Sequence, residues 1–553
     1  MVAETFDHVV IGAGSAGGVL AARLSEDPAT RVLLIEAGGS HRHPLIRMPA
    51  GWGRTVHWAR YAWLYQTEPE PMAHGRRVRL PRGKVLGGSS SINGMLYVRG
   101  HRLDFDRWAA EGARGWSWRE LLPYFVRSED QARLTGPLHG RGGALVAADL
   151  DTVHPLASAM VEAAEHNGLP RRDDFNGGEN EGCGLPQVNV RDGRRVAVAV
   201  GAIEPALRRR NLALACGALA TRILLDGRRA VGVRYRKGGV EREARVRGEV
   251  LLCGGAINSP QLLMLSGIGP AGALHAHGIE VRHALEGVGG NLHDHCVVTM
   301  TWRCRPGVRS LNEELHGWRM LRSAWHYFAA RRGALVSPAS EFMCFLRSDP
   351  AQAHADIQVF GLPISGDVEA AVVRGEDLRP ERFAGFTLAP AQLRPHSRGM
   401  LRLRSADPDE PPSIRMNYLA DERDRRATIA AMRWVRRMVA QPALASLVEA
   451  ETRPGPGRST DEALLDYVAG YLSSGHHAVG SCRMGRSDDE HAVVDPELRV
   501  RGIEGLRVAD ASVMPSIISG NTNAACVVIG EKCADLVRGR RPPPPPDLQG
   551  EAA

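Results

Sequence analysis

The chain has 553 residues, 43% of them hydrophobic, and a formal net charge of +8. That length exceeds what one ordinary hydrophobic core needs, so at least two structural units are expected. The 70 Lys and Arg residues are scattered along the chain. A nucleic-acid-binding protein is therefore excluded as the working hypothesis, because such proteins gather their charge on one face.

The cysteines and the apolar segments indicate the compartment. The nine cysteines include no Cys-x-x-Cys pair, so neither a zinc site nor a disulfide framework is predicted. Free thiols favour a reducing cytosol. The sequence starts without a basic and apolar leader, and no apolar run reaches the length of a membrane span. We therefore expect a cytoplasmic protein without a transmembrane segment, and peripheral contact with a membrane stays open.

The first forty residues predict a strand, a glycine-rich turn, a helix and a second strand. Buried strands are expected at 8–11 and 32–35, with a helix between them. The turn places Gly12, Gly14 and Gly17 in the spacing Gly-x-Gly-x-x-Gly. Gly12 permits the tight turn, Gly14 lets the backbone approach a pyrophosphate, and Gly17 lets the helix pack closely on the strand.

An acidic residue ends the second strand at the distance typical of dinucleotide-binding folds. Glu36 lies about 20 residues beyond the glycines, where a carboxylate accepts hydrogen bonds from ribose hydroxyls. The N-terminus of the intervening helix offers free N–H groups to phosphate. This combination predicts a site for an ADP moiety, but it does not decide between FAD and NAD.

Two further segments are rich in small residues. PRGKVLGGSSSINGMLYVRG, at 81–100, is expected to be an irregular loop whose backbone N–H groups allow close approach to a flat, polar ring. GGAINSPQLLMLSGIGP, at 254–270, follows an expected strand at 250–253. Ser259 and Pro260 are expected to open a helix there, because proline favours the first helical turn.

These segments resemble the two signature segments of the glucose–methanol–choline (GMC) oxidoreductase family. The likeness continues to LRVADASVMPSIISGNTNAACVVIGEKCADL near the C-terminus and covers nearly the whole chain. Within the family, the sequence most resembles the choline-dehydrogenase-like bacterial members. It implies an α/β fold, with a Rossmann-like FAD-binding domain of the glucose-oxidase type and a substrate-binding domain built on an antiparallel sheet with helices. It also implies FAD, a small-molecule alcohol as substrate, and a quinone-type acceptor or O2 for the electrons.

The resemblance assigns cofactor contacts residue by residue. Ile92 stands where some members attach FAD through a histidine, so non-covalent FAD is expected. Ala220 matches a backbone contact to the adenine, and Asp510 with Ala511 matches the C-terminal flavin-binding segment. The expected cofactor contacts are Gly12, Gly14, Ser15, Ala16, Gly17, Glu36, Ala37, Trp63, Arg82, Gly87, Gly88, Asn93, Gly94, Ala220, Asp510, Ala511, Asn521 and Thr522.

SSGHHAVGSCRMG carries the expected base. Alcohol oxidation needs an acceptor for the hydroxyl proton, and histidine suits because its pKa lies near neutrality. The family has His-Pro before V-G-T-C-R-M-G, which assigns the base to His477 and leaves His476 at a variable position. Ala478 replaces the usual proline, which is expected to loosen the backbone there, and Ser481 replaces threonine. Asn521 matches the family's His-or-Asn position and is expected to hold the substrate oxygen.

Other histidines are assigned no catalytic role. NLHDH offers His293, Asp294 and His295 as a metal cluster, but the family has a similar segment without metal, so no metal site is predicted. Three further histidines are expected at the surface: His275, His277 and His283.

The segments that match the family are split along the chain. The FAD-binding domain is expected to comprise 1–150, 200–299 and 479–541, the substrate-binding domain 151–199 and 300–478, and a disordered proline-rich tail 542–553.

Substrate choice falls in the segments that match least. Glu341 matches a glutamate near the ammonium group in choline-oxidising members, but acids are common at that position and choline does not follow from it. Trp318, Trp325 and Phe360 are expected either to line the pocket or to join the aromatic core. The alternative function on the same scaffold is a hydroxynitrile-lyase-like enzyme that holds FAD without net redox, since a lyase also needs a base.

Overall fold

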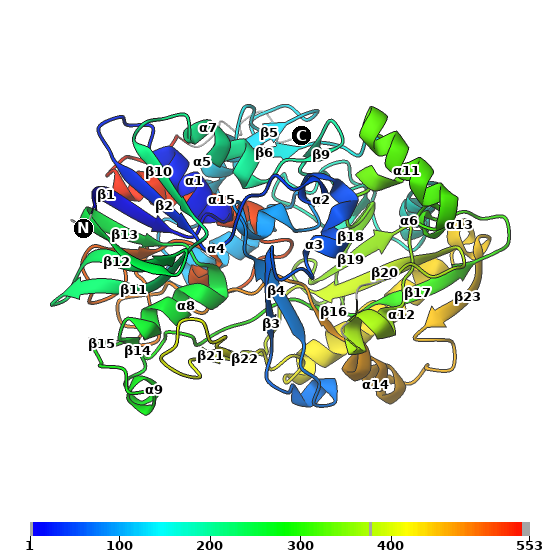
Figure 1. Ribbon diagram of the computed structural model, residues 1–553. Coiled ribbons are helices and arrows are strands. Elements are labelled where there is room, and N and C mark those ends of the chain that lie inside the picture. The colour runs from blue at the N-terminus through cyan, green and yellow to red at the C-terminus, as the bar shows by residue number, and fades with distance from the viewer. Residues whose placement is uncertain (1–3, 375, 377–378, 545–553) are drawn as a thin grey trace.

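The computed structural model describes residues 4–374, 376 and 379–544, and Figure 1 shows a sheet on each side of the molecule. The first sheet has a parallel core in the order β10-β2-β1-β13, with β25 parallel to the end of β13 and the hairpins β11-β12-β13 antiparallel. Its strands are β1 (Glu4–Ile11), β2 (Val32–Glu36), β10 (Leu212–Cys216), β11 (Ala218–Asp226), β12 (Arg229–Lys237), β13 (Val240–Leu252) and β25 (Leu506–Val508).

The second sheet is antiparallel at every pairing, in the order β23-β17-β20-β19-β18-β7, with β16 joined to β20 and β24. Helices α6 (Pro155–His166) and α12 (Glu422–Val439) pack against it. The predicted fold class is therefore confirmed. The strands are β7 (Gly182–Gly184), β16 (Cys296–Val297), β17 (Met300–Cys304), β18 (Phe342–Leu346), β19 (Ile357–Leu362), β20 (Gly385–Gln392), β23 (Val448–Arg453) and β24 (Ser473–Ser474).

The two ends of the chain meet beside the first sheet. Helix α1 (Ser15–Leu24) packs along α15 (Asn523–Val537), and α5 (Trp118–Ser128) packs against α15 from another side. The fully buried carboxylate of Glu531 pairs with Arg23 at 3.0 Å and with Arg127 at 2.6 Å. A buried carboxylate needs such partners, because an unpaired charge is costly away from water. The C-terminal segment is thereby fixed against the N-terminal one.

The expected start of the helix after the 250–253 strand is wrong. Helix α8 runs from Gly255 to Leu265, so Pro260 lies inside it instead of opening it. An internal proline leaves the carbonyl four residues earlier without its helical donor. That carbonyl, of Ala256, accepts a hydrogen bond from the hydroxyl of Ser481 at 2.6 Å. A partner distant in sequence therefore permits a proline that local rules place at the helix start.

The expectation for Trp318 and Trp325 is also wrong, because both lie at the surface. They belong to α11 (Gly317–Ala330), where their exposed fractions are 65% and 67%. The helix buries Ser323 and Tyr327 instead. Among the histidines expected at the surface, His275 is exposed, while His277 and His283 are half-buried.

The domain boundaries stay a prediction, although strands of the two sheets alternate along the chain as discontinuous domains require. Most of the expected tail, 545–553, lies outside the described residues, and 542–544 form neither helix nor strand. No helix within 4–374, 376 and 379–544 is both long and apolar enough to cross a membrane.

Candidate active site

A cavity of about 490 Å³ is lined by residues of both sheets. Ile11 and Ile35 reach it from the C-terminal ends of β1 and β2, and Val297, Phe360 and Ala389 reach it from the antiparallel sheet. Ligands bind outside the carboxyl ends of the strands in open parallel sheets. The cavity therefore occupies the position in which a dinucleotide would lie across the first sheet and reach towards the second.

The glycines of the β1–α1 turn are required by close backbone approach. Gly12 has φ +100°, and a Cβ there would lie 2.4 Å from the carbonyl oxygen of Cys253. A Cβ on Gly17 would lie 2.0 Å from the carbonyl oxygen of Gly12, so no side chain fits between helix and strand. Gly88, at φ +55°, presses on Gly14, because a Cβ on Gly88 would lie 2.7 Å from the Gly14 Cα. These contacts leave a bare backbone surface along the cavity.

Glu36 lies at the end of β2 with both carboxylate oxygens engaged. They accept hydrogen bonds from the backbone N–H groups of Ala13 at 3.0 Å and Gly38 at 2.7 Å. Burial raises the pKa of Glu36 to about 7. Each oxygen keeps a second lone pair, so the carboxylate can still accept from the hydroxyls of a ribose.

The glycine-serine loop is held from outside by two arginines. Arg82 donates to the backbone carbonyl of His476 at 2.6 Å and to the hydroxyl of Ser89 at 3.0 Å. Arg195 is buried and donates to the side-chain oxygen of Asn93 at 2.7 Å. Burial lowers the pKa of Arg195 to about 9. Asn93 therefore faces the cavity in an orientation fixed by its partner.

Two helix N-termini meet at the cavity. Ser15 begins α1, and its hydroxyl donates to the side-chain oxygen of Asn523, the first residue of α15, at 2.7 Å. Both residues line the cavity, as does Thr522 at the N-cap of α15. Because N-termini carry free N–H groups and the positive ends of helix dipoles, they favour an anionic ligand such as a pyrophosphate.

Asp510 joins the C-terminal segment to the first turn of α8. One of its carboxylate oxygens accepts from the backbone N–H of Gly255 at 2.8 Å and from the hydroxyl of Ser259 at 2.5 Å. Burial raises its pKa. With the glycine surface and the helix N-termini, this wall fits a long, flat dinucleotide with a charged centre.

Nearly all predicted cofactor contacts line this cavity. Gly17 and Gly87 do not, since Gly17 packs helix on strand and Gly87 forms a turn at φ +90°. The lining includes Gly12, Gly14, Ser15, Ala16, Glu36, Ala37, Trp63, Arg82, Gly88, Asn93, Gly94, Ala220, Asp510, Ala511, Asn521 and Thr522, together with His477.

The loop that carries His477 is anchored to Asp294. One carboxylate oxygen of Asp294 accepts from the backbone N–H of His477 at 2.7 Å. The other accepts from the hydroxyl groups of Tyr418, at 2.7 Å, and Ser474. Asp294 is almost fully buried, and burial raises its pKa against these opposing hydrogen bonds. The loop is thus fixed on both sides of the histidine pair.

A chain of hydrogen bonds determines the tautomer of His477. His295 Nε2 lies 3.1 Å from the backbone carbonyl of Leu393, which only accepts, so Nε2 carries the hydrogen. Burial lowers the pKa of His295 to about 4, so at neutral pH its Nδ1 has no hydrogen. That Nδ1 lies 2.9 Å from Nδ1 of His477 and accepts its N–H. Nε2 of His477 therefore carries no hydrogen and acts as an acceptor.

The free nitrogen of His477 faces the second predicted catalytic residue. Asn521 Nδ2 lies 3.1 Å from Nε2 of His477 and donates to it. The Asn521 side-chain oxygen accepts from Nε2 of Gln358 at 3.3 Å, which fixes the amide in this orientation. Enclosure within the protein lowers the pKa of His477 well below 6.5, with His295 and His476 adding to the effect. The arrangement presents a neutral base and an amide donor to one point in the cavity.

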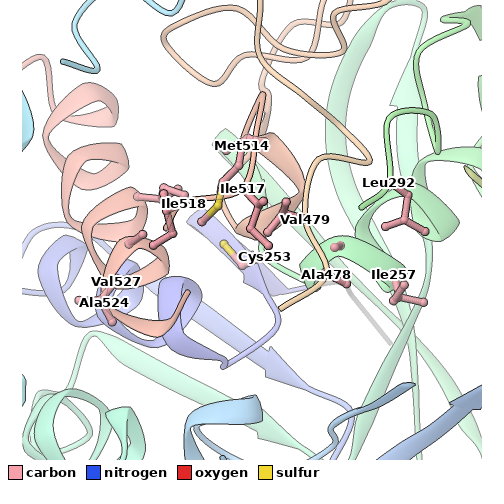
Figure 2. Packing of buried hydrophobic residues seen from close by; sticks show 14 of the residues in the cluster. Cys253, Ile257, Leu292, Ala478, Val479, Met514, Ile517, Ile518, Ala524 and Val527 are labelled. Carbon is pink, nitrogen blue, oxygen red and sulfur yellow. The ribbon is translucent and has the colours of Figure 1, made fainter. Parts of the chain in front are cut away.

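The backbone beyond His477 is packed and paired, although Ala478 replaces the usual proline. Ala478 and Val479 are buried in the cluster that includes Ile257, Met514 and Ile518 (Figure 2). The backbone of Val479 also exchanges two hydrogen bonds with that of His293, at 2.9 and 3.2 Å. Packing and pairing therefore hold the chain where a proline was expected to do so.

His476 and His293 have other tasks. His476 lines the cavity at φ +62°, and its carbonyl is bound by Arg82. His293 is buried, with Nδ1 donating to the carbonyl of Asn291 at 2.6 Å and Nε2 accepting from the N–H of Ile517 at 2.9 Å. Within the described part of the chain, no group of three or more His, Cys, Asp or Glu is placed to hold a metal ion.

His295 and Arg195 are the contributors that sequence reasoning missed. His295 belongs to NLHDH, which was considered only as a metal cluster, and its closeness to an expected base was not visible. Arg195 lies in an arginine-rich stretch typical of a solvated surface, yet only 2% of it is exposed. Neither role has a local signal, because each partner lies more than 100 residues away.

Comparison with known protein families gives matches along most of the chain. A family model described as GMC oxidoreductase matches residues 6–297, and a second model of the same description matches 395–530. The oxygen-dependent choline dehydrogenase of Brucella canis is 40% identical over 536 residues, which cover 97% of this chain and 96% of the relative. The enzyme of that name from Escherichia coli O127:H6 is 42% identical over 542 residues, with the same coverage of each chain.

Solved structures are similar over the same extent. Pyridoxine 4-oxidase from Mesorbium loti superposes with a TM-score of 0.87 at 33% identity, covering 97% of this chain and 100% of its own. A formate oxidase superposes with a TM-score of 0.89 at 28% identity, covering 97% and 98%. These proteins are similar to the chain over both sheets and the cavity between them.

Proposed function

Because the chain belongs to the GMC oxidoreductase family and is an FAD-dependent alcohol oxidoreductase, we propose that His477 is its general base and that Asn521 holds the substrate oxygen. FAD, when bound, supplies the acceptor for the hydride that leaves the substrate carbon. A redox reaction is supported over the lyase alternative, because the matched relatives are a dehydrogenase and oxidases.

The unprotonated Nε2 of His477 is the observation that carries the proposal. This nitrogen takes the proton of the alcohol hydroxyl as the hydride leaves the neighbouring carbon, and the alcohol becomes a carbonyl compound. Nδ1 keeps its hydrogen bond to His295 throughout, which holds the ring. Asn521 donates to the substrate oxygen and stays neutral, so it stabilises developing negative charge without competing for the proton.

We propose non-covalent attachment of the cofactor. Ile92 is buried at 3% exposure and lines the cavity, and its hydrocarbon side chain has no atom that bonds to a flavin. Denaturing the yellow protein with acid is expected to release the flavin into the supernatant. A yellow protein pellet after washing would contradict non-covalent binding.

We propose a neutral, largely apolar alcohol as substrate, in contrast to choline. Phe360, Leu362 and Ala389 supply apolar lining from the antiparallel sheet, and Arg82 adds a positive charge close to the base. Among residues 4–374, 376 and 379–544, the only carboxylates in the lining are Glu36 and Asp510, both on the side of the first sheet. A quaternary ammonium group would lose its hydration there without a counter-charge, which is costly.

Glu341 does not supply that counter-charge from the cavity wall. It is buried but is not among the lining residues. Its carboxylate accepts from the hydroxyl of Ser337 at 2.6 Å and from the backbone N–H of His154 at 2.8 Å. Burial raises its pKa against these two hydrogen bonds.

Choline and its uncharged carbon analogue, in which carbon replaces the nitrogen, differ only in charge. We expect the analogue to have the higher kcat/KM, by about tenfold or more, which is about 1.4 kcal/mol of discrimination. A higher kcat/KM for choline, abolished in Glu341→Gln while the analogue is unaffected, would contradict a neutral substrate and identify Glu341 as the counter-charge.

We propose that the reduced enzyme passes its electrons to a quinone-type acceptor or to O2, and that it works in the cytoplasm. The nine free thiols support a reducing compartment. The reaction is tested by mixing the yellow protein anaerobically with a panel of alcohols. Bleaching of the flavin band is expected, and the following rates of oxygen uptake and quinone reduction identify the acceptor. No bleaching across the panel, with cleavage of a cyanohydrin, would contradict alcohol oxidation.

A further inference from the structure

Helix α11 carries its large apolar residues on the outside. Trp318, Leu321, Trp325 and Phe328 have exposed fractions of 65%, 74%, 67% and 59%. Their spacing of three, four and three residues places them on one face of the helix. Figure 1 shows α11 at the edge of the molecule, with its outer side turned away from both sheets. A contiguous apolar face of this kind marks an interaction surface.

Arginines outnumber carboxylates around this face. The stretch 317–333 holds four arginines and no Asp or Glu. Glu313 and Glu314, which precede it, pair with Arg319 at 3.7 Å and Arg322 at 3.0 Å. The arginines at the other end, Arg331 and Arg332, follow the last turn, and Arg332 is exposed. The surface therefore combines an apolar stripe with a cationic end.

These two properties select a lipid bilayer with anionic head groups. Tryptophan and phenylalanine favour the boundary between head groups and acyl chains. Arginine extends its charged group to the head groups while its stem stays in the apolar layer. A helix with an apolar face and a cationic border lies in the plane of such an interface.

The buried side of α11 packs on segments that continue into the cavity lining. On its buried side, Tyr327 of α11 packs with Met48 and Leu335 in one apolar cluster. The segment after Met48 continues into α3 (Trp52–Thr55), whose Trp52 lines the cavity, and the segment after Leu335 continues to Ala339, which also lines it. Helix α11 is therefore connected to the cavity wall through two short segments.

We propose that the outer face of α11, formed by Trp318, Leu321, Trp325 and Phe328, binds the surface of an anionic lipid bilayer. The helix lies along the interface, and the arginines at its C-terminal end contact the head groups. This contact brings the cavity to the membrane, where lipid-soluble alcohols and acceptors are concentrated.

Vesicle flotation of the FAD-loaded enzyme tests the proposal, with phosphatidylcholine vesicles that contain or lack phosphatidylglycerol. Binding is expected to the vesicles that contain phosphatidylglycerol, and to weaken at high salt. Replacement of both tryptophans, Trp318→Ser with Trp325→Ser, is expected to lower the bound-to-free ratio by about tenfold or more. The matched control, Val240→Ser with Met400→Ser, removes exposed apolar residues elsewhere and is expected to bind as the wild type does. Arg332→Glu is expected to weaken binding to anionic vesicles.

Two results would overturn the proposal. One is a wild type that floats with neither vesicle, or a tryptophan variant that floats as the wild type does. The other is light scattering that shows a dimer for the wild type and a monomer for the tryptophan variant. A second copy of the chain would then cover the face. All variants are compared in their oxidation of a water-soluble alcohol with a water-soluble acceptor. That activity is expected to be unchanged, so loss of membrane binding is separable from failure of the proposed reaction.

Discussion

The two ring nitrogens of His477 have different partners, and this difference leaves one of them without a hydrogen, as the proposed base requires. Nδ1 donates to His295, whose own Nε2 donates to the Leu393 carbonyl, so Nε2 of His477 carries no hydrogen at neutral pH. The hydrogen-bond partner of one ring nitrogen of a histidine often determines which nitrogen carries the hydrogen. His295 is thus a positioning residue, placed in the second sheet's segment and joined to the base across 182 residues.

Two replacements of His295, one with and one without a hydrogen-bond acceptor, test its role in positioning His477. His295→Gln retains an oxygen that can accept the Nδ1–H of His477, whereas His295→Leu removes it. We expect a loss in the rate of flavin reduction of about tenfold in His295→Gln and of about a hundredfold in His295→Leu, within the range of general base catalysis.

The pH profile distinguishes positioning from a purely structural effect. The acidic limb of kcat/KM is expected to shift in His295→Leu, because His477 loses its fixed tautomer and a neighbour that lowers its pKa. Equal losses in both variants with an unchanged profile would show that His295 only fills space.

The register of the sequence motif predicted which histidine faces Asn521, and the structure brings His477 and Asn521 within 3.1 Å. The motif did not predict which ring nitrogen of His477 carries the hydrogen, because the tautomer depends on atoms from segments distant in sequence. At the scale of single residues, the sequence therefore predicts that His477 and Asn521 lie together, but not which groups orient them.

At the scale of elements, the β1–α1 turn has little room for side chains. Three backbone segments meet there, and Gly17 faces the carbonyl of Gly12 across a gap that admits no side chain. The strand, turn and helix were predictable because their signals are local. The start of α8 was not, because Pro260 is accommodated by a hydroxyl from Ser481.

Gly17→Ala is expected to abolish flavin binding. Its Cβ would lie 2.0 Å from the Gly12 carbonyl oxygen, so helix α1 must move and its N-terminus leaves the cavity. The matched control is Gly272→Ala, whose Cβ meets nothing within 4 Å. The ratio of flavin absorbance to protein in the purified variants measures the effect. A yellow Gly17→Ala protein with the flavin content of the control would contradict this role of the turn.

At the scale of the whole molecule, the active site joins two sheets whose strands alternate along the chain. The sequence predicted this alternation through motifs that return in order. It did not predict the outward face of α11, since an apolar helical pattern by itself indicates burial. Whether such a face is buried depends on whether distant segments of the chain offer an apolar surface for it to pack against.

Buried neutral histidines make the stability of the whole molecule depend on pH. Burial lowers the pKa of His295 from 6.5 to about 4. The unfolded chain therefore binds a proton at a higher pH than the folded chain, and stability is lost as pH falls below 6.5. This group alone is expected to cost about 2 kcal/mol between pH 7 and pH 5.

Thermal melting of the wild type and His295→Gln checks this dependence. Between pH 7 and pH 5, the Tm of the wild type is expected to fall by about 2 °C more than that of the variant. Identical falls in the two proteins would show that His295 is not held neutral by the fold.

The proposed division of labour between His476 and His477 is tested most directly by anaerobic stopped-flow measurement of flavin reduction in His477→Ala and His476→Ala, with one alcohol and equal flavin content. His477→Ala is expected to reduce its flavin about 10² to 10⁴ times more slowly than the wild type, the usual scale for loss of a general base. His476→Ala is expected to stay within about tenfold of the wild type. A His477→Ala protein that bleaches as fast as the wild type, or a larger loss in His476→Ala, would contradict the assignment of the base.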